Sequence, residues 1–431
     1  MIIIKELLKI KAPVILETAT PRTDALNKLK GYLGVTPYTL SYDASLNQEY
    51  VVQNSKITVN DKEFTNAILN REYPLEIHVV PSFCEKAVEL CIKTADTCNI
   101  LIACNTIMQA ASIYRDLKNK GLSPILLHSQ FTIQDREQKL KMLREQLGKG
   151  STIAICTQVI EVGVNLDFDL LITDAAPLAS LIQRVGRIGR HIERVEEKFP
   201  IHLIYDTSYE QKNIKLYSYI YPLELTKQTT QLLLDLRNQG ASISWRIPAS
   251  KKFNNAVPYN LLAQEIYHNQ ELYNPQVASI LRAILSPSTN PSDAILQIAK
   301  LHNLIRDSII MPVYIPPDYS ELKPGNPIVL HARRLVPAKP YSLGLELHET
   351  NLEIHDDKAV KTSLKLVNDK LLAVFEESES EQTLLLKVST RELYECLSKG
   401  FLRRNGRRYL FRALIANEHA YNNEEGLITW L

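Results

Sequence analysis

Three arginines and two glycines share one short segment near the middle of the chain. The segment reads Q-R-V-G-R-I-G-R and contains Gln183, Arg184, Gly186, Arg187, Gly189 and Arg190. An arginine is always charged, and its planar fork of donors fits phosphate oxygens and the charge that develops during phosphoryl transfer. Glycine lets the backbone turn tightly. An isolated R-x-G-R is more typical of a solvated basic turn, but this pattern follows a buried strand and a polar loop. It therefore predicts a loop that faces a ligand.

Apolar runs and segments of helical period alternate in front of this loop and behind it, and they would position it. Strands are expected at 77–81, 100–104, 125–128, 152–156, 170–173 and 201–205, and helices at 83–97, 107–118, 134–147 and 178–185. Continuous apolar strands separated by helices predict a parallel sheet covered on both faces. Ligands of such sheets bind beyond the carboxyl ends of the strands.

Small polar residues follow three of these strands. Asn105 and Thr106 follow one strand, Ser129 follows another, and Thr157 and Gln158 follow a third. Their hydroxyl and amide groups, together with backbone NH groups at helix starts, suit the phosphates of a nucleic-acid backbone. The other interpretation is that Thr106 and Thr157 only cap helices.

The pattern as a whole resembles a known family. The segment Q-R-V-G-R-I-G-R is similar to motif VI of superfamily 2 helicases, and T-Q-V-I-E-V-G-V-N at 157–165 is similar to their motif V. The closer resemblance is to the CRISPR-associated helicases of type I systems, in which T-Q-V-x-E, D-F-D-L-L-I-T and A-P-L-x-S-L-I-Q-R-x-G-R recur in this order. L-I-A-C-N-T at 101–106 resembles motif IV, and L-L-H-S-Q-F-T-I-Q-D-R at 126–136 also resembles the family. The resemblance is strong from about residue 98 to about residue 206.

This resemblance implies roles for individual residues. Arg187 and Arg190 would be catalytic arginine fingers that reach across the cleft between two lobes to the phosphates of ATP. Nucleotide binding would involve Gln183, Arg184, Gly163 and Asn165. Asn165 stands where many relatives have an aspartate that bonds the ribose, so nucleotide binding would be weakened or re-tuned.

Further roles concern the coupling of ATP to nucleic acid. Thr18-Ala19-Thr20 resembles motif III, which with Glu161 of motif V would couple the state of ATP to the grip on the strand. Contacts to nucleic acid would come from Asn105, Thr106, Ser129, Thr157 and Gln158.

The nucleotide cradle of such a motor is not found in the sequence. No G-x-x-x-x-G-K-[ST] occurs, since the segment 148–152 has similar letters but the wrong spacing, and no D-E-x-x box occurs either. The chain is therefore expected to hold the second half of the motor and the end of the first. A separate or missing N-terminal RecA-like lobe would hold ATP and Mg²⁺, and the chain alone is expected to be inactive.

Composition sets broad limits. Hydrophobic residues make up 45% and charged residues 23% of the 431 residues, as in ordinary globular proteins, and the formal net charge is +2. No apolar run approaches a membrane span, and the N-terminus is unlike a signal peptide, so a cytoplasmic location is expected. Cys84, Cys91 and Cys98 would lie on one face of a helix as buried small residues, and no metal ion is assigned.

Four parts are expected along the chain. These are the end of a first RecA-like domain at 1–36, a second RecA-like domain at 37–206, a helical linker at 207–315 and a mixed α+β accessory domain at 316–431. The fold class is thus α/β, with a RecA-like parallel sheet followed by the linker and the accessory domain. A proline-rich stretch marks the last boundary.

Within the accessory domain, strands are expected at 351–354, 363–367, 371–375 and 383–388, a helix at 391–398 and a hairpin at 401–411. Arginines flank Asn405-Gly406 at the turn of that hairpin, which predicts a surface hairpin, with a phosphate grip as the alternative. His355-Asp356 is expected to lie in a loop, without a nuclease site.

The preferred function is the second lobe of an ATP-dependent single-stranded DNA translocase or helicase in CRISPR antiviral defence. Its expected partners are single-stranded DNA, the missing lobe, a CRISPR surveillance complex and a nuclease subunit, and no membrane. The alternatives are a nucleic-acid-binding remnant without turnover, and an RNA or repair helicase of superfamily 2.

Overall fold

The computed structural model describes most of the chain from residue 71 onward. The described residues are 14, 30–31, 33–34, 39–42, 50–53, 56–59, 71–161, 164–191, 198–210, 220–245, 256–267, 310–320, 322–347 and 351–427. Contacts divide the chain into two compact units. One consists of Met1–Ile125 and Leu143–Asn274, and the other of Leu126–Met142 and Pro275–Leu431. The four expected parts stay a prediction.

A six-stranded sheet carries the helicase-like motifs. Its order is β4-β9-β8-β5-β7-β6, with β4 at Leu75–Val80, β5 at Ile100–Ala103, β6 at Ile125–Leu127, β7 at Ile153–Cys156, β8 at Leu170–Asp174 and β9 at Ile201–Asp206. The β4·β9, β9·β8, β8·β5 and β5·β7 pairs are all parallel. Every residue of β5, β7 and β8 is buried, because helices cover these central strands. The expected parallel sheet is confirmed.

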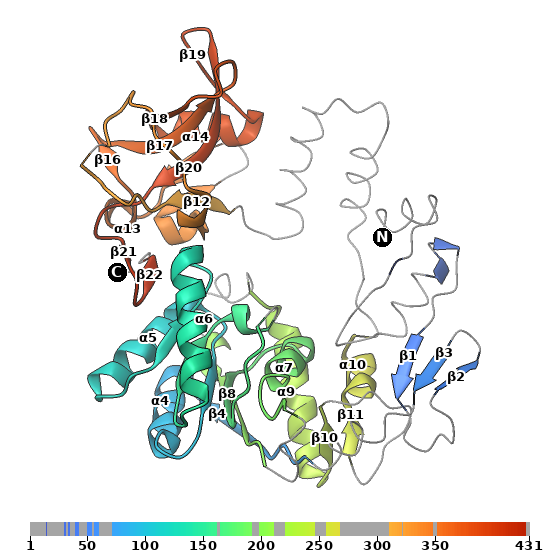
Figure 1. Ribbon diagram of the computed structural model, residues 1–431. Coiled ribbons are helices and arrows are strands. Elements are labelled where there is room, and N and C mark those ends of the chain that lie inside the picture. Colours follow the sequence, from blue (N-terminus) through green and yellow to red (C-terminus); the bar gives the residue numbers. More distant parts are fainter. Residues whose placement is uncertain are drawn as a thin grey trace. The chain divides into compact units, whose positions relative to one another are not determined.

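Helices connect the strands, and each follows a polar residue or a proline that starts it. They are α4 at Phe83–Thr94, α5 at Ile107–Asn119, α6 at Ile133–Leu147 and α7 at Leu178–Val185. Along the strand order, the connections through α4 and α5 run from β4 toward β6, and the connection through α7 runs back toward β4. Right-handed crossovers then place α4 and α5 on one face and α7 on the other, as Figure 1 shows.

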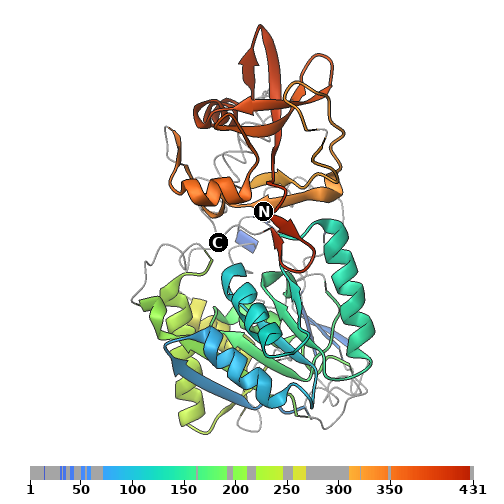
Figure 2. The same ribbon diagram turned by 90° about the vertical axis from the view of Figure 1, so that its left-hand side faces the viewer.

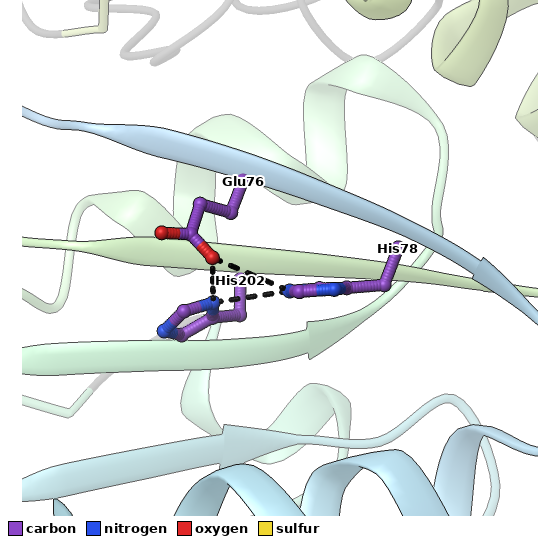
Figure 3. Close-up of side chains that lie close together, drawn as sticks. All are labelled: Glu76, His78 and His202. Atoms are coloured by element: carbon purple, nitrogen blue, oxygen red, sulfur yellow. Dashed lines mark hydrogen bonds and ion pairs between the residues drawn. The ribbon is translucent and has the colours of Figure 1, made fainter.

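The register of the outer strands sets side chains opposite one another. On β4 and β9, Glu76 pairs with His202 and His78 pairs with Ile204. Because alternate residues of a strand point to one face, Glu76 and His78 lie on the same side of the sheet (Figure 3).

Smaller elements complete the first unit. They are a three-stranded sheet of β1 (Thr39–Tyr42), β3 (Lys56–Val59) and β2 (Tyr50–Gln53), helices α9 (Leu223–Asn238) and α10 (Tyr259–Tyr267), and the strand pair β10 (Ser242–Ser244) and β11 (Ala256–Pro258). Short 3-10 turns follow β7 at Gln158–Ile160 and β9 at Thr207–Glu210. The two helices fall in the segment expected to be a helical linker.

The second unit is built on a seven-stranded mixed sheet. Its path is β13-β12-β20-β17-β16, with β18 paired to β17 and β19 to β20. The strands are β12 (Met311–Tyr314), β13 (Leu335–Ala338), β16 (Leu366–Val367), β17 (Lys370–Glu377), β18 (Thr383–Val388), β19 (Leu402–Arg404) and β20 (Arg407–Ile415). Helix α14 (Thr390–Lys399) packs its buried Leu393 and Cys396 into the core of this sheet. The expected mixed α+β domain is confirmed.

Minor elements surround that sheet. They are helix α13 (Asp357–Ser363), the antiparallel pair β14 (Leu345–Leu347) and β15 (Leu352–Ile354), the C-terminal pair β21 (Tyr421–Asn422) and β22 (Gly426–Leu427), and 3-10 turns at Ala332–Arg334 and Tyr341–Leu343.

The hairpin of β19 and β20 matches its sequence signal. Asn405 and Gly406 have φ values of 49° and 81°, the left-handed conformation that a tight two-residue turn requires. Arg404 pairs with Arg407 across the turn. The hairpin projects from its unit in both views (Figures 1 and 2).

One expected strand is largely wrong. Only Leu366–Val367 of the segment 363–367 is a strand, and helix α13 ends at Ser363. Asp356 accounts for the helix, because its side chain accepts a hydrogen bond from the Ala359 backbone NH and so caps the first turn. His355-Asp356 therefore leads into a helix.

Among the described residues, no helix is both long and apolar enough to span a bilayer.

Candidate functional site

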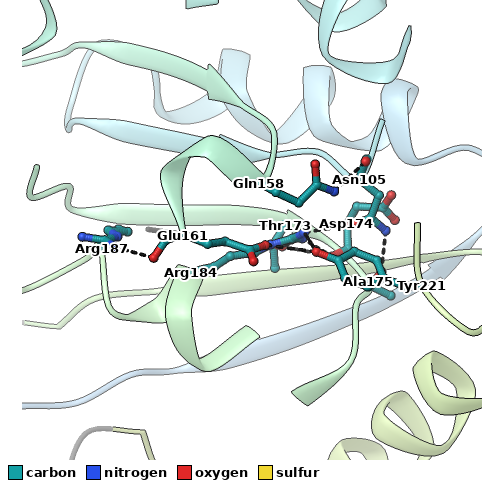
Figure 4. A network of polar contacts seen from close by, with 9 residues as sticks. All are labelled: Asn105, Gln158, Glu161, Thr173, Asp174, Ala175, Arg184, Arg187 and Tyr221. Atoms are coloured by element: carbon teal, nitrogen blue, oxygen red, sulfur yellow. Dashed lines mark hydrogen bonds and ion pairs between the residues drawn. The ribbon is translucent and has the colours of Figure 1, made fainter. Parts of the chain in front are cut away.

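Arg184 lies at the centre of a buried polar network (Figure 4). Its side chain extends from α7 and is 1% exposed. Its Nε donates to Glu161 Oε1 at 3.0 Å, one terminal nitrogen donates to Thr173 Oγ1 and the Asp174 carbonyl at 2.9 and 3.1 Å, and the other donates to Asn105 Oδ1 and the Tyr221 hydroxyl at 2.9 and 3.3 Å. A guanidinium has five N–H groups, so each one has an acceptor. The charge is fully compensated inside the protein.

Asn105 links two strand ends at the carboxyl edge of the sheet. It follows β5, is 1% exposed, and donates from Nδ2 to the Ala175 carbonyl beyond β8 at 2.7 Å. Its own carbonyl accepts from Gln158 Nε2 at 2.7 Å. The segments that resemble motifs IV and V are therefore hydrogen-bonded to each other, with Arg184 of motif VI bonded to the same asparagine.

Tyr221 closes the network from outside the motifs. Its hydroxyl lies 3.1 Å from Glu161 Oε1, and its ring centroid lies 5.9 Å from the Arg184 guanidinium carbon. Burial raises the pKa of Tyr221 and Arg184 lowers it in part, with a net rise, so the hydroxyl stays protonated. Glu161 thus receives two hydrogen bonds on one oxygen, as a buried carboxylate requires.

Arg187 turns back onto the motif V segment. One terminal nitrogen donates to the Val164 carbonyl and the other to the Glu161 carbonyl, the latter at 2.5 Å. The side chain is only 9% exposed. In this conformation the guanidinium holds its own lobe together, and its role as a finger stays a prediction.

Arg190 differs from Arg187 in being exposed. Asp167 orders the backbone at this point, since its carboxylate accepts from the NH groups of Arg190 and His191 at 2.7 and 3.0 Å. Gly189 has a φ of 54°, and a Cβ atom there would lie 2.5 Å from the Phe199 ring. The loop therefore needs glycine at this position for both conformation and space.

The residues expected at nucleic acid fall into two groups. Thr106 caps α5, and its hydroxyl and the Gln109 side chain form a reciprocal capping box. Thr157 precedes a 3-10 turn without a side-chain cap bond and is 3% exposed. Asn105 is buried as well, whereas Thr106, Ser129 and Gln158 are half-buried. The interpretation as a cap therefore holds for the Thr106 side chain.

Asp174 is a buried acid that sequence reasoning did not single out. It ends β8 and accepts from the Tyr209 hydroxyl at 2.7 Å and from Gln109 Nε2 at 2.9 Å. Burial raises its pKa to about 7, although these two hydrogen bonds and the nearby Arg184 lower it in part. Asp174 therefore titrates near neutral pH.

Of the other expected residues, two are described, and no hydrogen bond joins them to this network. Asn165 is exposed and Gln183 is half-buried. Gly163 and Thr18-Ala19-Thr20 lie outside the described residues. The sequence analysis missed Thr173 and Asp174. Both stand at the carboxyl end of a strand, where ligands of parallel sheets bind, so their position could have identified them. Tyr221 and Asp167 carried no comparable signal.

Comparisons with known proteins agree on one segment. Residues 96–193 match the family described as CRISPR-associated nuclease/helicase Cas3, C-terminal. A CRISPR-associated nuclease/helicase Cas3 of Streptococcus thermophilus is 41% identical over 85 residues, which cover 19% of this chain and 9% of that protein. The Cas3 of Methanothermobacter thermautotrophicus is 30% identical over 177 residues, which cover 40% of this chain and 20% of that protein. The matches thus span a small part of these relatives.

A solved structure shows a similar fold over a larger part of the chain. A crystal structure described as a CRISPR-associated protein aligns with a TM-score of 0.52 and 16% identity. The alignment covers 82% of this chain and 48% of that one. At this identity the likeness concerns the fold.

Proposed function

We propose that the chain supplies the second motor lobe of an ATP-driven DNA translocase in CRISPR defence, because residues 96–193 match the family described as CRISPR-associated nuclease/helicase Cas3, C-terminal. The ATP and Mg²⁺ are held by an N-terminal RecA-like lobe on another polypeptide or segment. Arg187 and Arg190 of the loop after α7 face the nucleotide of that lobe. A surveillance complex and a nuclease subunit are the proposed assembly partners.

The Arg184 network is the observation that carries this proposal. At the carboxyl ends of the strands, it bonds Arg184 to Asn105 and Glu161, and the Glu161 carbonyl accepts from Arg187 of the following loop. Ligands of parallel sheets bind at this edge, and phosphoryl transfer is catalysed mainly by fixed positive charges placed against the phosphates. A loop anchored in this way can present Arg190 with little reorganisation.

The two finger candidates would act at different stages. Arg190 is exposed and can meet a phosphate without breaking a contact of the kind that holds Arg187. Arg187 must first exchange the carbonyls of Glu161 and Val164 for phosphate oxygens. ATP binding would thereby release motif V, which is a route from the nucleotide to the DNA grip.

Contacts to single-stranded DNA come from the same edge. Thr106 and Gln158 are half-buried and are the proposed side-chain contacts, whereas Asn105 and Thr157 position the backbone. Ser129, in the other compact unit, stays an expected contact to nucleic acid. Binding through phosphates weakens steeply as salt rises. The logarithm of the association constant for single-stranded DNA should therefore fall linearly with the logarithm of the salt concentration.

The test is ATPase activity with single-stranded DNA. It is measured for the chain alone and for the chain mixed with a polypeptide that carries the P-loop lobe of a Cas3 relative. We expect activity only in the mixture, and Arg190→Ala should lower its rate by about 10³-fold or more, as loss of an arginine finger does. Arg237→Ala, which removes an exposed arginine of α9, is the matched control.

The outcomes separate the proposal from its alternatives. Absence of ATPase activity both for the chain alone and in the mixture, together with retained DNA binding, would support a binding remnant. A rate stimulated by RNA in place of DNA would support an RNA helicase of superfamily 2. An unchanged ATPase rate for both Arg187→Ala and Arg190→Ala would show that neither arginine of this loop acts as a finger.

A further inference from the structure

A cluster of three potential metal ligands lies at one edge of the sheet, apart from the Arg184 network. Glu76 and His78 lie on β4, and His202 lies on the adjacent strand β9 (Figure 3). The strand period and the parallel register bring all three to the same face. Their ligand atoms lie within 4.8 Å of one another.

The distances fit three corners of a tetrahedron. His78 Nε2 and His202 Nδ1 are 3.1 Å apart, and Glu76 Oε2 lies 3.3 Å from His202 Nδ1 and 3.8 Å from His78 Nε2. Zinc bonds to nitrogen and oxygen are about 2.0–2.2 Å long, which places the ligand atoms of a tetrahedral site about 3.4 Å apart. Small side-chain shifts would bring the three atoms to equal distances from a common centre.

The neighbouring helix α4 contributes Lys86 and Lys93, which both form ion pairs with Glu89. Lys86 of α4 is the nearby cation, and it is held by Glu89 at 3.0 Å. Glu76 is exposed, with 61% of its side chain accessible, so an ion can enter from solvent. The histidine side chains are 19% and 12% accessible and are therefore already ordered.

We propose that Glu76, His78 and His202 bind a divalent transition-metal ion of the Zn²⁺ type, with water at the fourth position. Two imidazoles and one carboxylate are a ligand set that zinc uses in proteins when one position stays open. The ion would cross-link the edge strand β4 to β9. Because it binds the folded lobe and not the unfolded chain, it stabilises the lobe in proportion to the logarithm of its concentration.

The experiment is a calorimetric titration of the full chain with Zn²⁺ after treatment with a chelator. One equivalent should bind, and His202→Asn should weaken that binding by at least about tenfold, since changes even around a metal site have effects of this size. His419→Asn removes a histidine whose side chain is 88% accessible in the second unit, and it should leave the affinity unchanged.

A second variant covers the case in which His202→Asn fails to fold. Glu76→Gln changes an exposed side chain and keeps its shape, and it should also weaken Zn²⁺ binding. The Co²⁺ form should show a tetrahedral spectrum without a thiolate-to-metal charge-transfer band, because no cysteine belongs to the cluster. Absence of the single equivalent, unchanged affinity in both ligand variants, or a thiolate band would each overturn the proposal.

Discussion

Arg184 is a charged side chain with almost no access to water, and its cost of burial is offset by five acceptors. Burial would lower the pKa of Arg184, but Tyr221 and Glu161 raise it above the ordinary value, so the charge is retained. Glu161 forms the opposite charge at 3.0 Å. A buried ion pair of this kind favours a unique arrangement more than it favours stability.

Removal of the Arg184 charge should therefore be severe. Arg184→Met would leave the Glu161 carboxylate buried without its partner, and we expect the free energy of unfolding to fall by about 3–5 kcal/mol. Urea unfolding of the variant measures this. Arg184→Met combined with Glu161→Gln should recover part of the loss, whereas a loss equal to the sum of the two single effects would contradict the coupling.

Asp174 gives the lobe a pH dependence of its own. Its pKa is about 7 in the folded protein and 3.8 when exposed, so the folded state binds more protons between these values. Its contribution to stability is present below pH 3.8 and is lost as the pH rises to about 7.

The variant Asp174→Asn should abolish this effect. Relative to the parent, it should gain stability from pH 5 to pH 8, by at most about 1.4 kcal/mol per pH unit within the window. Unfolding midpoints in urea at several pH values provide the measurement. A variant that loses stability on the alkaline side instead would show that the carboxylate is needed in its charged form.

At the scale of elements, the loop after α7 depends on one glycine. The Gly189 carbonyl accepts one hydrogen bond from Arg71, and the Gly189 NH donates to the Phe168 carbonyl at 3.1 Å. Its backbone lies against the Phe199 ring, which leaves no space for a side chain. The position of Arg190 is set by this contact together with Asp167.

Gly189→Ala should therefore destabilise the lobe and displace the finger loop. We expect a loss of about 2–4 kcal/mol in the free energy of unfolding, from the left-handed backbone and the overpacked ring together. Gly150→Ala is the control, because Gly150 has a φ of 85° and no atom within 4 Å of a built Cβ. If both variants lost the same stability, contact with Phe199 would have no role.

At the scale of the whole chain, distant segments meet within the second unit. The Tyr421 hydroxyl donates a hydrogen bond to the Asp135 carboxylate, and it accepts one from the Thr132 backbone NH at 3.0 Å. His128 Nε2 donates to the Glu425 carbonyl at 2.9 Å, and its Nδ1 accepts from the Gln130 NH at 3.2 Å. Protonation of Nδ1 would place two donors against each other.

Acid should therefore destabilise this unit. Burial lowers the pKa of His128 to about 3, with a further decrease from Lys139, against the bond to Glu425, which raises it. Below pH 6.5 the His128 imidazole binds a proton in the unfolded state but not in the folded state. Stability is therefore lost as the pH falls from 6.5 to about 3.

The variant His128→Gln tests this, because Gln keeps a donor and an acceptor but does not titrate. Its free energy of unfolding, measured with urea, should vary less between pH 7.5 and pH 5 than that of the parent. The difference should be up to about 1.4 kcal/mol per pH unit. His419→Gln is the exposed control. Equal slopes in all three proteins would exclude His128 as the source.

The local elements of the sheet could be predicted from the residues alone. The strand at β7, the helix α7 and the turn at Asn405-Gly406 follow from apolar periodicity and from φ preferences, which depend on near neighbours in sequence. The loop of Arg187 and Arg190 was placed by the same local pattern and by the resemblance. Its function as a finger loop remains a proposal.

Tertiary structure alone decided which side chains meet. Arg184 contacts Asn105, which is 79 residues away in sequence, and Tyr221, which is 37 residues away. His78 contacts His202, which is 124 residues away. Nothing in a local pattern specifies such pairs, because strand order and register set them. The same arginine could have faced solvent or a phosphate, and the buried acceptors at three strand ends are the physical reason that it turns inward.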